Sequence, residues 1–283
     1  MLRVSCPAVP RKSIPKTVVA ANAVLHSRTR GRRSRASPLL DAAQARDFRG
    51  ALLAWFRAHG RDLPWRRTRN AYHVVVSEFM LQQTQVSRVE AYYARFLDRF
   101  PDVHTLATAE PHRVREVWQG LGYYRRAANL QALAQTVLRE HGGQLPDDVE
   151  ALQALPGVGR YTAGAVASFA YERAVPAVDT NVARVLRRVF RPDRPPAPND
   201  RVLWDVGAAI VPPAPQDAWA FNQAIMELGA LVCTARVADC PRCPVQKACL
   251  VGRLVMASEA LRGPALDAAM EAAEALVRPA IAP

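Results

Sequence analysis

The stretch LPGVGRYTAG, at residues 155–164, joins two segments of helical character and places two glycines around one small apolar residue. Gly157 and Gly159 can adopt φ angles above zero, and neither has a side chain that would cover the main-chain N–H groups. The Ala-rich run that follows predicts a helix, and a helix N-terminus favours an anion. Alone, the stretch is a tight turn between helices. Together with the motifs below, it predicts an anion-binding hairpin.

Apolar residues recur at helical spacing on both sides of this hairpin, and two-residue alternation is nearly absent. The Pro-rich run at 191–200 predicts a loop. These patterns predict an all-α fold. The expected helices cover residues 48–59, 74–82, 86–100, 114–118, 130–141, 149–155, 161–170, 182–189 and 221–232.

The formal net charge of +13 is concentrated at one end of the chain. Residues 1–40 carry nine Lys or Arg and no acidic residue, so we expect a disordered basic leader there, with a secretory signal or an organelle transit peptide as alternatives. Residues 255–283 form an Ala-rich tail. No apolar run approaches the ~20 residues that span a bilayer, so we expect no membrane partner.

Four of the five cysteines lie within seventeen residues, with the spacing C-x6-C-x2-C-x5-C. Four thiolates in one short segment can hold a 4Fe–4S cluster or a tetrahedral zinc ion, in a reducing compartment. Zinc ribbons usually separate two C-x2-C pairs widely, so this spacing favours iron–sulfur. The predicted ligands are Cys233, Cys240, Cys243 and Cys249.

Two acidic residues have neighbours that could suit them to chemistry. Glu78 lies among apolar residues of a predicted helix, where burial would raise its pKa and make it a general acid; otherwise it is a solvated surface residue. Asp179 lies at a predicted helix start, where it caps the helix and would stay ionised. One protonated acid and one fixed carboxylate form a two-carboxylate site.

The region from about residue 51 to 249 resembles the helix-hairpin-helix DNA glycosylases, and within them the adenine DNA glycosylases. Seven motifs occur in the family's order. They are LPWR at 63–66, SEFMLQQTQV at 77–86, GLGYY at 120–124, the hairpin at 155–164, VDTNV at 178–182, FNQ at 221–223 and the four cysteines. One departure is Thr180, where this subfamily often has glycine.

The resemblance implies two helical lobes with double-stranded DNA and a flipped adenine between them. The six-helix barrel would comprise residues 70–175, and the lobe with the 4Fe–4S cluster would comprise 41–69 and 176–254. The implied substrates are adenine mispaired with 8-oxoguanine or guanine. Fuller family members read 8-oxoguanine with a C-terminal domain, for which the 34 residues after Cys249 are too few.

The resemblance also implies residue roles. Glu78 would protonate adenine N7, and Asp179 would stabilise the oxocarbenium-like sugar. The other matched positions support this pair (Tyr161 and Asn181), form the adenine pocket (Trp65, Arg66 and Gln223) or enter the base stack (Gln83 and Tyr123). Each has an ordinary alternative, such as Trp65 in the core or Arg66 as a surface charge.

Tyr161 stands where strand-cleaving members place a lysine that forms a Schiff base. We therefore expect a monofunctional, monomeric hydrolase. It would act in a bacterial cytoplasm and nucleoid, or in a eukaryotic nucleus or mitochondrion. The alternatives are an endonuclease III-type glycosylase and lyase, and a non-catalytic Fe–S protein that binds DNA.

Overall fold

The computed structural model describes residues 40–191, 198–236 and 238–253. Within these ranges the chain is helical, and the only β pairing is an isolated bridge between Cys233 and Ala238. The predicted all-α fold is therefore confirmed. Among the described helices, none is both long and apolar enough to cross a membrane. The predicted basic leader, except Leu40, the Ala-rich tail and most of the Pro-rich loop lie outside the described residues.

Eleven α-helices and three short 3-10 helices are present in the described part of the chain. In order they are α2 (Ala42–His59), η1 (Pro64–Arg66), α3 (Ala71–Leu81), α4 (Val86–Arg99), α5 (Val103–Thr108), α6 (Pro111–Trp118), α7 (Arg125–Glu140), α8 (Val149–Gln153), α9 (Arg160–Tyr171), α10 (Thr180–Phe190), α11 (Arg201–Ile210), α12 (Pro215–Leu231), η2 (Cys240–Arg242) and η3 (Gln246–Ala248).

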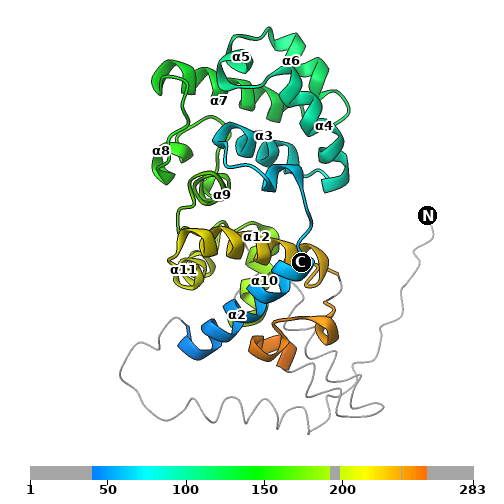
Figure 1. Ribbon diagram of the computed structural model, residues 1–283, viewed down its shortest axis with the longest axis vertical. Coiled ribbons are helices and arrows are strands. Elements are labelled where there is room, and N and C mark those ends of the chain that lie inside the picture. The colour runs from blue at the N-terminus through cyan, green and yellow to red at the C-terminus, as the bar shows by residue number, and fades with distance from the viewer. Residues whose placement is uncertain (1–39, 192–197, 237, 254–283) are drawn as a thin grey trace, which may run out of the picture.

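Two hydrophobic clusters lie one above the other (Figure 1). The upper cluster is formed by η1 and helices α3 to α9, with Trp118, Phe79 and Phe96 among its fully buried side chains. The first residue of this cluster in the chain is Leu63. Trp65, two residues later, is also buried, and its ring packs edge-to-face on that of Tyr93 with ring centroids 5.5 Å apart. The boundaries of the two predicted lobes stay a prediction.

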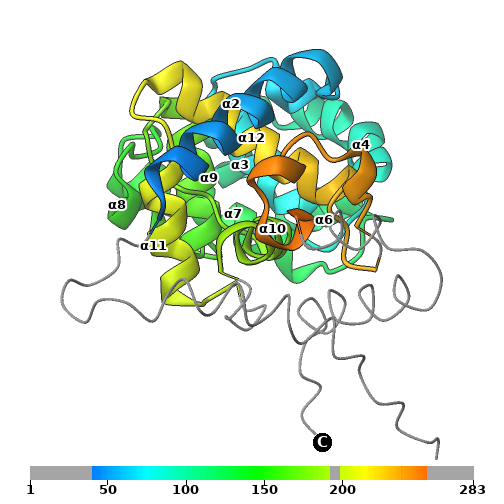
Figure 2. The ribbon, with the colours of Figure 1, turned by 90° about the horizontal axis from the view of Figure 1, so that it is seen from below.

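The lower cluster joins parts of the chain that are far apart in sequence. It combines α2 with α10, α11, α12 and the cysteine-bearing segment. Figure 2 shows α2 near α12 and the cysteine-bearing segment beside α10. Phe48 of α2 anchors the contact, with its ring 5.2 Å from Phe190 and 6.2 Å from Phe221. The N-terminal helix and the C-terminal segment therefore share one core.

Several helices begin at an Asp or Asn that caps the first turn. Asn70, Asp102, Asp148 and Asp200 each accept a hydrogen bond from a backbone N–H of the helix that follows. Such caps satisfy donors that have no partner within the helix. Two of these helices, α5 and α11, are absent from the sequence-based expectation, and their caps are the signal that could have found them.

The hairpin connects α8 to α9. Gly157 has a φ of +76°, and a Cβ there would lie 2.8 Å from Cβ of Asn129 and 3.0 Å from Phe79, so glycine is required for both reasons. Gly159 does not adopt a positive φ. Its φ is −89°, and a Cβ there would meet nothing within 4 Å. Gly159 is the N-cap of α9, where the missing side chain leaves the helix N-terminus open.

Candidate active site

Most of the predicted site residues line one cavity of about 380 Å³. The cavity is enclosed by η1, the C-terminal end of α3, the N-terminal ends of α9 and α10, and one face of α12. It therefore collects side chains from segments more than 150 residues apart. The predicted residues that line it are Trp65, Arg66, Glu78, Gln83, Tyr161, Asp179, Asn181 and Gln223.

Glu78 points its carboxyl group into this cavity from the last turns of α3. The side chain is 5% exposed, and Oε2 has no hydrogen-bond partner in the protein. Burial raises the pKa of Glu78 to about 7; a hydrogen bond with Tyr161 opposes the rise, and the charge of Asp179 adds to it. A carboxylic acid that retains its proton near neutral pH can act as a general acid.

Asp179 is the N-cap of α10 and lines the same cavity. Its Oδ1 accepts from the backbone N–H of Val182 at 2.7 Å, and its Oδ2 accepts from Asn181 Nδ2 at 2.9 Å. Burial raises the pKa of Asp179, while these two hydrogen bonds and the charge of Arg184 favour the ionised form. Asp179 can cap α10 and line the cavity at the same time, because its two oxygens have different partners. Oδ1 accepts a hydrogen bond from the backbone of α10, and Oδ2 accepts one from the Asn181 side chain.

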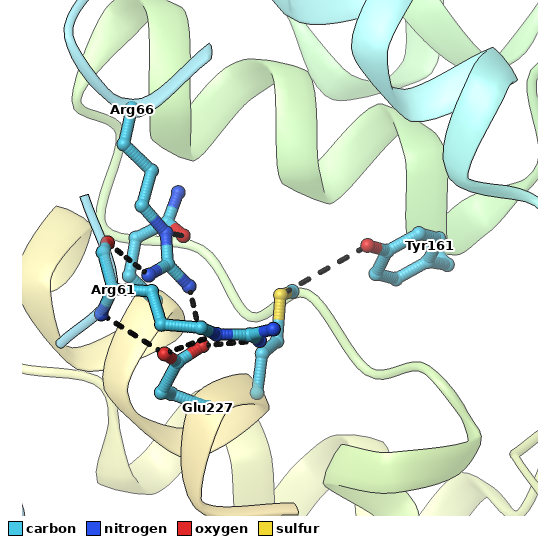
Figure 3. Close-up of polar contacts among 6 residues, drawn as sticks. Arg61, Arg66, Tyr161 and Glu227 are labelled. Carbon is cyan, nitrogen blue, oxygen red and sulfur yellow. Dashed lines mark hydrogen bonds and ion pairs between the residues drawn. The ribbon is translucent and has the colours of Figure 1, made fainter. Parts of the chain in front are cut away.

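Tyr161 lies in the first turn of α9, across the cavity from α12. Its hydroxyl group is directed at the sulfur of Met226, at 3.9 Å (Figure 3). Burial raises the pKa of Tyr161 well above its usual value, and the charges of Glu78 and Asp179 act in the same direction. The phenol therefore stays protonated and can donate a hydrogen bond to a carboxylate.

Arg61 and Arg66 converge on the buried carboxylate of Glu227 (Figure 3). Arg61 donates to Glu227 through Nε at 2.7 Å and Nη2 at 2.8 Å. Burial alone would raise the pKa of Glu227, but hydrogen bonds from Arg61 and Arg66 outweigh it and lower the pKa to about 2. Arg66 also donates from Nε to Gln223 Oε1 at 2.7 Å.

Three further residues of the site, Arg61, Met226 and Glu227, were not predicted from the sequence. The spacing of Gln223 and Glu227, four residues apart in an apolar helix, is the signal that was available, because it places both on one helix face. Nothing in the sequence near Arg61 indicates its partner, since Glu227 lies 166 residues away.

Gln83 and Tyr123 lie at the rim. Gln83 is exposed and lines both the main cavity and a shallow hollow beside it, whereas Tyr123 lines only the hollow and is 61% exposed. Both have left-handed backbone conformations, with φ of 55° and 46°. Such conformations are strained in residues other than glycine.

A hydrogen-bonded chain leads from Asp179 to the cysteine-bearing segment. Asn181 bridges to Arg184, whose Nη2 donates to Asn181 Oδ1 at 2.8 Å. The Nε of Arg184 donates to the carbonyl oxygen of Cys233 at 2.8 Å. One guanidinium therefore contacts both the carboxylate network and the first of the clustered cysteines.

The four clustered cysteines line one small, largely apolar pocket, and none of them forms a disulfide. Arg188 Nη1 donates to Cys233 Sγ at 3.1 Å, and the backbone N–H of Gly252 donates to Cys249 Sγ at 3.2 Å. Within the described ranges, no group of three or more His, Cys, Asp or Glu side chains is arranged to hold a metal ion.

Comparisons with known proteins identify the class. Residues 76–202 match the family described as HhH-GPD superfamily base excision DNA repair protein. A thermostable thymine-DNA glycosylase has a similar structure, with a TM-score of 0.69, 28% identity, and 74% of this chain and 98% of that chain covered. A trapped endonuclease III–DNA covalent intermediate gives a TM-score of 0.64 and 26% identity, covering 77% and 99%. The chain belongs to the HhH-GPD superfamily.

Within this superfamily, the chain is similar to proteins named adenine DNA glycosylase. The protein from Homo sapiens is 44% identical over 246 residues, which are 83% of this chain and 44% of the human protein. The proteins from Rattus norvegicus and Mycolicibacterium smegmatis are each 47% identical, over 74% and 69% of this chain. The chain spans less than half of the human and rat proteins and 66% of the mycobacterial one.

Proposed function

We propose that this chain is an adenine DNA glycosylase of base excision repair. It would hydrolyse the N-glycosidic bond of adenine mispaired with 8-oxoguanine or guanine. The observation that carries the proposal is that Glu78, whose pKa is about 7, faces the same cavity as Asp179, which caps α10. Relatives with 44% and 47% identity that bear this name support the choice of base.

In the proposed reaction, the carboxylic acid of Glu78 donates its proton to adenine N7. The bond between C1′ and N9 then breaks, and its electron pair leaves with the adenine. The sugar acquires oxocarbenium character, which the carboxylate of Asp179 stabilises by charge. Water adds to C1′ and loses one proton to a carboxylate, which completes hydrolysis.

The neighbouring residues position this pair. Asn181 orients Asp179 through the 2.9 Å hydrogen bond, and the hydroxyl group of Tyr161, which lines the same cavity as Glu78, would donate to the Glu78 carboxyl group during the reaction. Trp65, Arg66 and Gln223 would enclose the flipped adenine. Because Arg66 is fixed by Glu227 and Gln223, its guanidinium gives that end of the cavity a defined shape.

The DNA contacts would lie outside the cavity. Gly157 and Gly159 leave the N-terminus of α9 open to a DNA phosphate. Gln83 and Tyr123 would enter the base stack around the mispair, which is consistent with the exposure of both side chains.

Tyr161 supports hydrolysis without strand cleavage. A phenol cannot form the imine through which a lysine at this position would attack the sugar. An endonuclease III-type lyase is therefore disfavoured, although an endonuclease III is among the similar structures.

The proposal includes a 4Fe–4S cluster. Cys233, Cys240, Cys243 and Cys249 would hold the cluster, and the support for this is that all four line one small pocket. N–H donors from Arg188 and Gly252 already point at two of the sulfurs. When bound, the cluster would supply four metal–sulfur crosslinks to this segment.

The wider setting belongs to the same proposal. The partner would be double-stranded DNA bound by a monomer, with the barrel at 70–175 and the cluster lobe at 41–69 and 176–254 holding the mispair between them. The compartment would be the nucleoid of a bacterium, or the nucleus or mitochondrion of a eukaryote.

Single-turnover excision on three duplexes tests the proposal. The target pairs are adenine opposite 8-oxoguanine, adenine opposite guanine, and thymine glycol opposite adenine. We expect strand breaks only at adenine and only after alkali, with no covalent complex trapped by borohydride. Breaks at thymine glycol without alkali would instead establish the endonuclease III-type reaction. DNA binding without excision would establish the non-catalytic alternative.

A further inference from the structure

Arg126, in the first turn of α7, caps the C-terminal end of α3. The residue is 7% exposed, and its Nη1 donates to the carbonyl oxygens of Phe79 at 3.0 Å and Met80 at 2.8 Å. The same nitrogen contacts the carbonyl oxygen of Gln82. The last carbonyl groups of a helix have no partner within it, so this guanidinium satisfies acceptors that would otherwise be buried and unpaired.

The other end of the same guanidinium binds a second loop. Nη2 donates to the carbonyl oxygens of Leu121 at 3.3 Å and Gly122 at 3.2 Å, and to Thr84 Oγ1 at 3.0 Å. Arg126 therefore joins the loop after α3 to the loop before α7, although these loops are about forty residues apart in the chain.

Each of the two loops carries one strained residue, directly after a carbonyl that Arg126 binds. Gln83 follows Gln82, and Tyr123 follows Gly122; their φ angles are 55° and 46°. The Tyr123 ring centroid lies 5.4 Å from the guanidinium carbon, within cation–π range. Strained backbone persists only where the surroundings hold it. Arg126 supplies that support for both residues.

We propose that Arg126 is a positioning residue that holds Gln83 and Tyr123 in the conformations and mutual placement that unstack a base pair. This inference rests on the proposed function, in which these two side chains enter the base stack. Arg126 is buried, and it lines the inner side of the hollow that Gln83 and Tyr123 line with Tyr124. It acts through the two loops and does not take part in glycosidic bond cleavage.

The chemistry of the side chain makes the role testable by Arg126→Lys. A guanidinium is a planar fork with five N–H donors, whereas an ammonium group has three donors on one nitrogen. Lysine retains the charge but cannot reach the carbonyls of both loops together. Gln131→Met is the matched control, because Gln131 is also buried on α7 and donates to a carbonyl, that of Ala109 at 2.6 Å, in the barrel core.

Three measurements separate positioning from folding. They are the unfolding temperature, single-turnover excision at saturating protein, and the fluorescence of 2-aminopurine beside an adenine–8-oxoguanine pair. For Arg126→Lys we expect loss of the 2-aminopurine increase and excision slowed by on the order of 10- to 100-fold. For Gln131→Met we expect a lower unfolding temperature with both DNA readouts unchanged.

Thr84→Val removes one acceptor of Arg126 and should show the same DNA defects as Arg126→Lys to a smaller extent. This second variant keeps the test valid if Arg126→Lys does not fold.

The outcomes are distinguishable from failure of the proposed function. If the wild-type protein excises no adenine, the proposed function fails. If the wild-type protein excises adenine but does not raise the fluorescence, or if Arg126→Lys and Thr84→Val raise it as the wild type does, the positioning role is wrong.

Discussion

Nη2 of Arg66 lies 2.9 Å from Oε2 of Glu227, and both side chains are almost completely withdrawn from solvent. The pair joins η1 to α12, so it fixes one wall of the cavity. A buried ion pair of this kind is costly to break, because the remaining partner keeps its charge without compensation.

Glu227→Gln is expected to destabilise the protein by about 3 kcal/mol and to slow adenine excision, because it leaves Arg61 and Arg66 without a carboxylate. Urea unfolding and single-turnover kinetics measure the two effects. Asp62→Asn is the control, since Asp62 pairs with Arg67 at the exposed surface and its loss should change neither quantity. Equal behaviour of the two variants would contradict the role given to Glu227.

Glu78→Gln is expected to abolish excision while DNA binding is retained. The pKa of Glu78 is higher in the folded protein, at about 7, than its ordinary value of 4.5, so the stability linked to its protonation is present at low pH and lost as the pH rises through 7. At pH 8 the glutamine variant should therefore be more stable than the wild type, by up to about 3 kcal/mol. Calorimetry at pH 5 and pH 8 checks this, with Glu116→Gln at the exposed surface as the control.

The pH profile of excision follows from the same carboxyl group. The acid form of Glu78 predominates below pH 7 and declines above it. The single-turnover rate constant should therefore fall by about tenfold per pH unit on the alkaline side. A rate that stays level to pH 9 would mean that the proton comes from another donor.

Asp179→Asn separates the two roles of this residue. Asparagine is as good an N-cap as aspartate, so we expect the unfolding temperature to change little. The negative charge is lost, however, and excision should fall by on the order of 10²- to 10³-fold. A normal rate in the folded variant would reduce Asp179 to a helix cap.

Iron content tests the cysteine site. The protein purified without oxygen should carry about four irons and four inorganic sulfides per chain. Removal of the iron by a chelator should lower the unfolding temperature, because crosslinks within the lower hydrophobic cluster are lost. One zinc per chain and no sulfide would identify the alternative that the cysteine spacing left open.

Local patterns made much of this arrangement predictable. Apolar periodicity predicted the longer helices, and the glycine at 157 predicted the turn at which α9 begins. Helix α5, with six residues, is too short to show apolar periodicity, whereas α11 was missed although Leu203, Trp204 and Ile210 are apolar and buried. The sequence did not predict the roles of Arg126, Arg61 and Glu227, because the groups that they bind lie at least 40 residues away in the chain. The one exception is the loop that contains Leu121, which is close to Arg126 in the sequence.

The sequence by itself determined the helical fold, the hairpin, the set of four cysteines and the two carboxyl groups, because each depends on neighbouring residues or on residue type. The tertiary structure alone decided the protonation of Glu78, since burial sets the pKa of that carboxyl group. It also decided which cations hold Glu227 and which guanidinium supports the two strained loops. Contacts between distant segments leave no pattern along the chain, so they emerge only when the helices pack.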